Sequence, residues 1–136
     1  MKKPSVCCLA LAASLCLNAC EARLEPVPLR PDASVVTVIN RLEAPVGSQE
    51  RLIKLLGEGI GGKMRHRPGF VSATIHKSLD SEHVVVYAQW ASEQALADAS
   101  RFVSEGGAPA MLEAFALGAA EVNAYAVVVV HRAPPG

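Results

Sequence analysis

The sequence lacks the residues that several common chemistries need. Its four cysteines all fall within the first twenty residues, so the rest of the chain has no pair for a disulfide framework. Aromatic residues make up only 4% of the chain, and 13 basic residues are balanced by 13 acidic ones without a basic stripe. A nucleic-acid partner is therefore disfavoured. No serine, cysteine or lysine is paired in the sequence with a base, so covalent catalysis has no support either.

The first twenty residues have the pattern of an export signal. A positive start, Met1-Lys2-Lys3, precedes an apolar stretch, 6–17, that is too short to span a bilayer. It ends in Leu17-Asn18-Ala19-Cys20, which resembles the lipobox of bacterial lipoproteins. That resemblance implies a lipid on Cys20, and Glu21 after it implies retention at the outer membrane, facing the periplasm. The alternative is an ordinary secretory signal cut at a small residue.

Three parts follow from this pattern. Residues 1–19 are the expected signal peptide, and 20–33, with three prolines, are the expected extended tether. Residues 34–133 are long enough for one domain with its own core. Two of the 13 basic residues leave with the signal, so 11 basic and 13 acidic residues remain. We therefore expect a cell-envelope protein held to the membrane by its lipid anchor alone.

Apolar periodicity predicts a β-α-β-β-α-β order in this domain. Ser48 is the expected N-cap of the first helix, and Ser92 caps a second helix that ends at Phe102. Pro109 suits the first turn of a further helix. The strands are expected at 35–42, 70–78, 83–90 and 122–132.

This order is that of an α+β, ferredoxin-like fold with an antiparallel sheet. Right-handed crossovers place the strands 35–42 and 83–90 side by side at the sheet centre, where we expect this pair to be parallel. The apolar runs Val35–Ile39, Val84–Val86 and Val127–Val130 indicate burial on both faces of the sheet. The helices cover one face, so we expect a homodimer in which a second copy covers the other.

Asn40 and Trp90 each follow an apolar run of a predicted strand and differ from it in character. Alternation along a strand places Asn40 on one face with Val38, and Trp90 on one face with Ala88. If both faces point toward the helices, an amide and an indole lie side by side in one cleft. A tryptophan at a strand end also fills a core, and an asparagine also bonds to local backbone. Both interpretations stay open on the residues alone.

Several segments together resemble the antibiotic biosynthesis monooxygenase domain over residues 35–100. They are Val38-Ile39-Asn40-Arg41, the Arg67-Pro68-Gly69-Phe70 turn, Ile75-His76-Lys77-Ser78-Leu79-Asp80 and Val86-Tyr87-Ala88-Gln89-Trp90-Ala91-Ser92-Glu93. The resemblance implies a dimeric α+β barrel with a pocket between sheet and helices. Some members oxidise anthrones to quinones with dioxygen, without metal or flavin. They use an asparagine on the first strand and a tryptophan ending the third.

Those two positions match Asn40 and Trp90, so the resemblance implies catalytic roles for both and no cofactor. The Asn40 amide would stabilise a substrate oxyanion, and Trp90 would stack on a planar ring. The side chains expected to bind the substrate are Val38, Ala88, Met64 and Phe115. A related haem-degrading branch needs a histidine and a further tryptophan in the second helical segment, but position 99 is alanine and no histidine lies between His83 and His131.

Two weaker signals, a glycine motif and the histidines, do not indicate a binding site. Residues 57–62 satisfy G-x-G-x-x-G, but they fall late in the first helix rather than between a strand and a helix. These glycines are expected to loosen the helix. The four histidines stand on separate segments, and only His76 and His83 are expected to face each other, across a hairpin. That pair would give at most a two-point metal site, so no metal is expected.

The sequence therefore predicts a cofactor-independent monooxygenase that oxidises a small anthrone- or quinol-like aromatic compound with dioxygen. The alternative is a non-catalytic, dimeric small-molecule-binding or stress-response module of the cell envelope. Oxygen uptake distinguishes the two.

Overall fold

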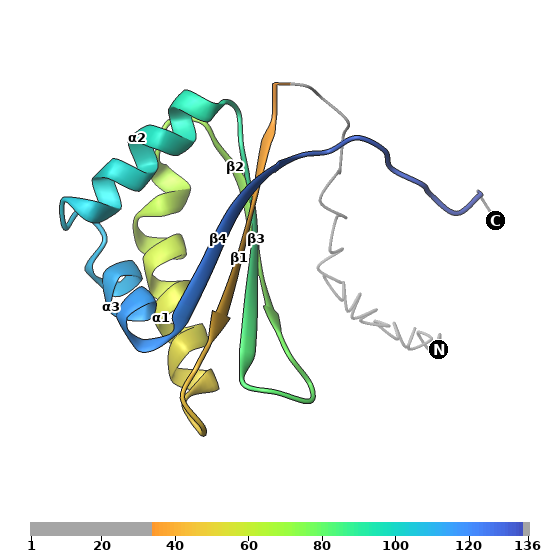
Figure 1. The fold of residues 1–136 in the computed structure, drawn as a ribbon. Coiled ribbons are helices and arrows are strands. Elements are labelled where there is room, and N and C mark those ends of the chain that lie inside the picture. The colour runs from red at the N-terminus through yellow and green to blue at the C-terminus, as the bar shows by residue number, and fades with distance from the viewer. Residues whose placement is uncertain (1–33, 135–136) are drawn as a thin grey trace, which may run out of the picture.

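The structure of the protein is a computed structural model that describes residues 34–134 (Figure 1). The predicted signal peptide, the Cys20 lipidation site and the tether lie outside the described residues. Within residues 34–134, no helix combines the length and apolar character needed to cross a bilayer.

The described chain forms a four-stranded sheet with all its helices on one face (Figure 1). Each neighbouring strand pair, in the order β2-β3-β1-β4, is antiparallel. This arrangement confirms the predicted α+β, ferredoxin-like fold. The elements in chain order are β1 (Val36–Glu43), α1 (Gln49–Gly62), the short 3-10 helix η1 (Met64–His66), β2 (Phe70–Lys77), β3 (His83–Trp90), α2 (Glu93–Ser104), α3 (Pro109–Leu117) and β4 (Ala119–Ala126).

The central strands β1 and β3 are neighbours, but the prediction that they run parallel is wrong. The crossover through α1 returns the chain so that β2 runs in the same direction as β1. The β2–β3 hairpin then reverses the chain, and β3 fits between those two strands with the opposite direction. As a result Val36 lies opposite Trp90, and Asn40 lies opposite Val86.

The last strand lies earlier in the chain than predicted. β4 covers Ala119–Ala126, whereas the apolar run suggested 122–132. Its position is set by its partner, because β1 begins at Val36, which pairs with Ala126. The run 127–130 has no strand beside it, and Val128 is 86% exposed. β4 is thus an edge strand, and all eight of its residues are exposed.

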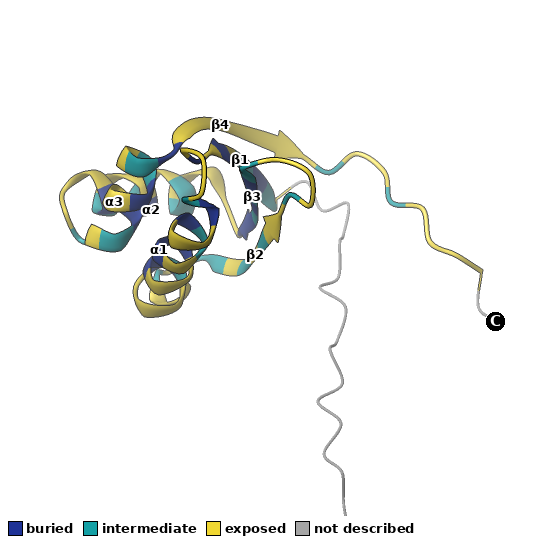
Figure 2. Ribbon diagram, turned by 90° about the horizontal axis from the view of Figure 1, so that it is seen from below, coloured by how far each residue is buried: buried dark blue, intermediate teal, exposed yellow. Residues whose placement is uncertain are grey.

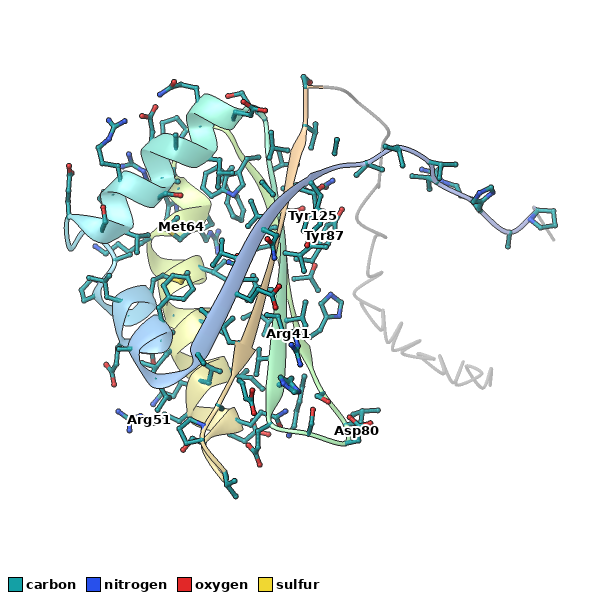
Figure 3. The ribbon with its side chains drawn as sticks, viewed as in Figure 1. Arg41, Arg51, Met64, Asp80, Tyr87 and Tyr125 are labelled. Atoms are coloured by element: carbon teal, nitrogen blue, oxygen red, sulfur yellow. The ribbon has the colours of Figure 1, made fainter. Side chains whose placement is uncertain are left out.

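The two faces of the sheet differ in polarity, contrary to the expectation that both would be apolar. The face under the helices carries the buried core, seen as dark blue in Figure 2. Arg41, Tyr87 and Tyr125 lie on the face away from the helices (Figure 3). Strand alternation adds Thr37 and Gln89 to that face, and both are buried although polar. Polar residues on the strands therefore give this face a polar character that the apolar runs alone did not predict.

The first residue of α1, Gln49, joins the start of the helix to the β2–β3 hairpin through hydrogen bonds. The Gln49 amide nitrogen Nε2 donates to the carbonyl oxygens of Ser78, Ser81 and His83, at 3.2, 2.8 and 3.0 Å. These bonds fix the β2–β3 hairpin against the helix start. Ser48 occupies the predicted N-cap position, but its side chain makes no capping hydrogen bond.

Ser92 caps α2 as predicted. Its hydroxyl accepts a hydrogen bond from the Ala95 backbone N–H at 3.1 Å. This bond satisfies one of the free N–H groups of the first turn and fixes where the helix leaves β3.

The glycines of α1 serve different purposes. A Cβ at Gly59 would lie 2.4 Å from the Met111 side chain, so Gly59 allows α3 to approach α1 closely. At Gly57, Gly61 and Gly62 a Cβ would meet nothing within 4 Å. Only Gly59 is therefore required by packing, and α1 continues through the glycines to Gly62.

Gly59 and Gly57 make a matched pair for a stability test. We expect Gly59→Ala to lower the free energy of unfolding by about 1–3 kcal/mol, because the new methyl group displaces Met111. Gly57→Ala should raise it by about 0.5–1 kcal/mol, since alanine favours the helix and enters open space. Urea unfolding measures both. Equal effects of the two substitutions would contradict the close α1–α3 contact.

Candidate functional site

A cavity of about 350 Å³ lies between the sheet and the helices. All four strands contribute to its floor, and α1, η1, α2 and α3 contribute to its walls and roof. Its size is within the range of small-molecule sites.

The cavity exists because small side chains form the middle of its floor. Ala73, Ala88 and Val38 lie side by side on β2, β3 and β1. Ala99 of α2 lines the same space from the helix layer. Trp90 bounds this row toward one end and Val86 toward the other.

The lining is almost entirely apolar. Among the residues that the structure describes, the side chains with polar atoms that line it are those of Asn40, Trp90, Ser100 and Ser104. The Ser104 hydroxyl already donates to the Arg101 carbonyl oxygen at 2.8 Å. A ligand oxygen therefore has few protein partners in this cavity.

Asn40 carries an unsatisfied polar atom into this setting. Its carbonyl oxygen Oδ1 is enclosed by the protein and has no hydrogen-bond partner. The amide nitrogen Nδ2 is not enclosed in this way, and Asn40 lines the cavity. The side chain does not bond to local backbone, which was the simpler interpretation of this residue. Buried polar groups without partners are rare in folded proteins. Because Asn40 also lines the cavity, its side chain is a candidate ligand contact through Nδ2.

Trp90 both fills the core and lines the cavity. It is 4% exposed and packs edge-to-face on Phe70, with ring centroids 5.4 Å apart and an interplanar angle of 88°. The same side chain is part of the cavity wall. Trp90 is therefore both a core residue and a residue of the cavity, the two positions that the sequence left open.

Asn40 and Trp90 share one face and one cavity, but they do not lie side by side as expected. Asn40 pairs with Val86, and Trp90 is four residues further along β3. At roughly 3.4 Å per residue, the two positions are about 14 Å apart along the strand. Asn40 lies in the middle of β1, whereas Trp90 ends β3 opposite the start of β1, so the two residues are separated along the cavity.

The four predicted substrate-binding residues all line this cavity: Val38 from β1, Ala88 from β3, Met64 from η1 and Phe115 from α3. Their binding role remains a prediction. Met64 points from the helix layer toward the sheet (Figure 3).

Sequence reasoning missed the contribution of α2. The residues that line the cavity from this helix recur at helical spacing: Leu96, Ala99, Ser100, Val103 and Ser104. Projecting α2 with 3.6 residues per turn would have found this stripe.

The polar face of the sheet forms a separate cluster. Arg41 Nη2 donates to His83 Nε2 at 2.8 Å, and His83 Nδ1 lies 2.8 Å from the Ser81 hydroxyl. His76 lies opposite Val85 rather than His83, so the predicted histidine pair across the hairpin is wrong. Within residues 34–134 no group of three potential metal ligands occurs.

Comparison with known proteins identifies relatives of this domain. The family model described as antibiotic biosynthesis monooxygenase matches residues 35–101. Over 65 residues the chain is 42% identical to tetracenomycin-F1 monooxygenase of Streptomyces glaucescens, a match that covers 48% of this chain and 58% of that enzyme. The chain thus spans little more than half the length of this relative.

Two solved structures show the same fold. SnoaB, a cofactor-independent oxygenase from Streptomyces nogalater, matches with a TM-score of 0.59 and 23% identity, covering 76% of this chain and all of that one. A monooxygenase-like protein from Shewanella loihica matches with a TM-score of 0.58 and 23% identity, covering 71% of this chain and 97% of that one.

Filling the cavity tests whether it is the ligand site. We expect Ala88→Phe to weaken binding of 1,8-dihydroxyanthraquinone at least about tenfold, since the added ring occupies the floor. Fluorescence of Trp90, the only tryptophan, reports binding because its ring lines the cavity. Ala97→Phe, on the exposed side of α2, is the matched control. Undiminished binding to Ala88→Phe would place the ligand elsewhere.

Proposed function

We propose that this protein, whose residues 35–101 match the antibiotic biosynthesis monooxygenase family model, is a cofactor-independent monooxygenase acting on a planar anthrone- or quinol-like aromatic compound. The observation that carries the proposal is that Asn40, a hydrogen-bonding side chain, lines an otherwise largely apolar cavity of about 350 Å³. Such a cavity accepts a flat aromatic body and offers one strong polar contact at one end.

The reaction draws on the reactivity of the substrate itself. An anthrone loses a proton from its methylene carbon to solvent, and the resulting anion gives one electron to dioxygen. The two radicals then join through a new C–O bond, and the peroxide anion takes a proton back from solvent to give a hydroperoxide. Loss of water leaves the quinone, so one oxygen atom of O₂ enters the product and the other leaves as water. Every electron in this sequence comes from the substrate.

Asn40 would promote the first step. Deprotonation places negative charge on the anthrone oxygen, and Nδ2 of Asn40, which lines the cavity, would donate a hydrogen bond to it. A donor of this kind has its largest effect where water is excluded, and the apolar lining of the cavity favours that condition once a substrate fills it.

Trp90 would contact the substrate ring, as expected, but away from the oxygen that meets Asn40. It lies about 14 Å from Asn40 along the sheet, at roughly 3.4 Å per residue, so both cannot contact the same substrate oxygen. Its ring would hold the far end of an elongated substrate. Asn40 therefore acts at the reacting oxygen, and Trp90 sets the position of the molecule.

These two roles predict different kinetic changes. Asn40→Ala should lower kcat about 10²–10³-fold, as for loss of an oxyanion donor. Trp90→Phe should mainly raise KM, since it removes contact area far from the reacting oxygen. Oxygen uptake with 1,8-dihydroxyanthrone, with and without a chelator, measures both. Full turnover by Asn40→Ala would exclude its proposed role.

The same assay separates the enzyme from the alternative function. Thermal stabilisation of the wild-type protein by the anthrone without any oxygen uptake would instead identify a non-catalytic binding module.

We further propose that the protein is a homodimer attached to the bacterial envelope through a lipid on Cys20. Support for the dimer comes from the sheet face that no helix of residues 34–134 covers and from β4, whose residues are all exposed. Tyr125 on this face is 46% exposed.

Light scattering at micromolar concentration should give the mass of a dimer. Tyr125→Asp should shift the protein toward monomer, because it places a charge on the bare face, whereas Ala97→Asp on α2 should not. A folded wild-type monomer at that concentration would contradict the dimer.

A further inference from the structure

We propose that a second cavity, alongside α2, binds a monocarboxylate with an apolar body. This cavity has a volume of about 570 Å³ and lies between α2 and the turn 67–69. It includes Ala99, which also lines the first cavity, but it lacks both Asn40 and Trp90. The proposed monooxygenase reaction makes no use of it.

The cavity contains a fixed guanidinium group. The Arg67 side chain stacks over the Phe102 ring, with Cζ 4.2 Å from the ring centroid. Phe102 is itself confined, because a Cβ at Gly107 would lie 2.2 Å from its ring. Stacking on a fixed ring holds the arginine fork in one orientation before any ligand arrives, so less side-chain freedom is lost on binding.

Arg67 has no anionic partner in the part of the chain that the structure describes. No carboxylate lies within ion-pair distance of it, and its Nε is enclosed without a hydrogen-bond partner. The terminal Nη nitrogens are not enclosed in this way, and Arg67 lines the cavity. A half-buried cation without a counter-ion is a strong candidate for binding an anion.

The other charges around the cavity limit what that anion can be. Arg101 already pairs with Asp98 at 3.4 Å, and Asp98 also accepts from Gln94 at 3.0 Å. Glu105 lines the cavity as well and would repel a ligand with two negative charges. One uncommitted guanidinium beside a carboxylate therefore favours a single negative charge.

The shape and polarity of the wall identify the rest of the ligand. Pro68, Ala91, Ala95 and Ala99 give the cavity an apolar side next to the guanidinium. The planar fork of arginine matches the two oxygens of a carboxylate, and an apolar body would cover the alanine wall. An aromatic or branched aliphatic monocarboxylate combines both features.

Calorimetric titration of the purified protein with benzoate tests this site. Benzamide is the neutral analogue of the same shape, and acetate carries the charge without the apolar body. We expect benzoate to bind at least about tenfold more tightly than either, since hydrogen bonds to charged groups contribute more than neutral ones. Trp90 fluorescence should stay unchanged, because its ring lines the other cavity.

Variants locate the contact. Arg67→Gln should weaken benzoate binding at least about tenfold, whereas Arg65→Gln, an exposed arginine that lines neither cavity, should leave it unchanged. Glu105→Gln should tighten binding, because it removes a nearby negative charge. If Arg67→Gln does not fold, Arg67→Lys keeps the charge but loses the fork and should give intermediate affinity.

Two results would overturn the proposal. Equal affinity for benzamide and benzoate would show an apolar cleft without charge recognition. Wild-type affinity in Arg67→Gln, or in Arg67→Lys where Gln does not fold, would show that benzoate binds elsewhere. Neither result would bear on the proposed monooxygenase function, which oxygen uptake at the first cavity tests separately.

Discussion

The antiparallel pairing of β1 with β3 is the constraint on which the arrangement of the site depends. It fixes Val38 beside Ala88 and Asn40 beside Val86, and it carries Trp90 to the far end of the sheet. A shift of one residue in this pairing would turn the apolar residues of either strand to the polar face. The buried residues Leu42 and Val84, which pair with each other, make such a shift costly.

The cavity follows from this register together with a few small residues. Alanines at 73 and 88 share one row of the sheet, and Ala99 approaches from α2, while Met111 of α3 packs closely against Gly59 of α1. The helix layer is therefore tight between α1 and α3 and open above the alanine row. Close packing at contacts such as Gly59 with Met111 allows the domain to keep an apolar cavity between the sheet and the helices.

Much of the fold could be predicted from the residues, because strand alternation and capping are local properties. The bounds of the strand His83–Trp90 were predicted correctly, and Ser92 caps the next helix as expected. The shared face of Asn40 and Trp90 also followed from alternation. The direction of β3 was predicted wrongly although the predicted elements imply it, because the α1 crossover makes β2 run with β1 and the hairpin then reverses β3. The position of β4 was also predicted wrongly, since its extent is set by its partner β1.

The site was predictable only where single residues differ from their surroundings. Asn40 is conspicuous in an apolar run, whereas alanines are common and their shared row appears only once the register is known.

The proposed reaction depends on Asn40 meeting a substrate oxygen in the first cavity. A crystal structure with 1,8-dihydroxyanthraquinone, which does not react with dioxygen, tests this most directly. The account predicts a ligand oxygen about 3 Å from Asn40 Nδ2 and the opposite ring against Trp90. A ligand outside this cavity, or one whose oxygens all lie away from Asn40, would contradict it.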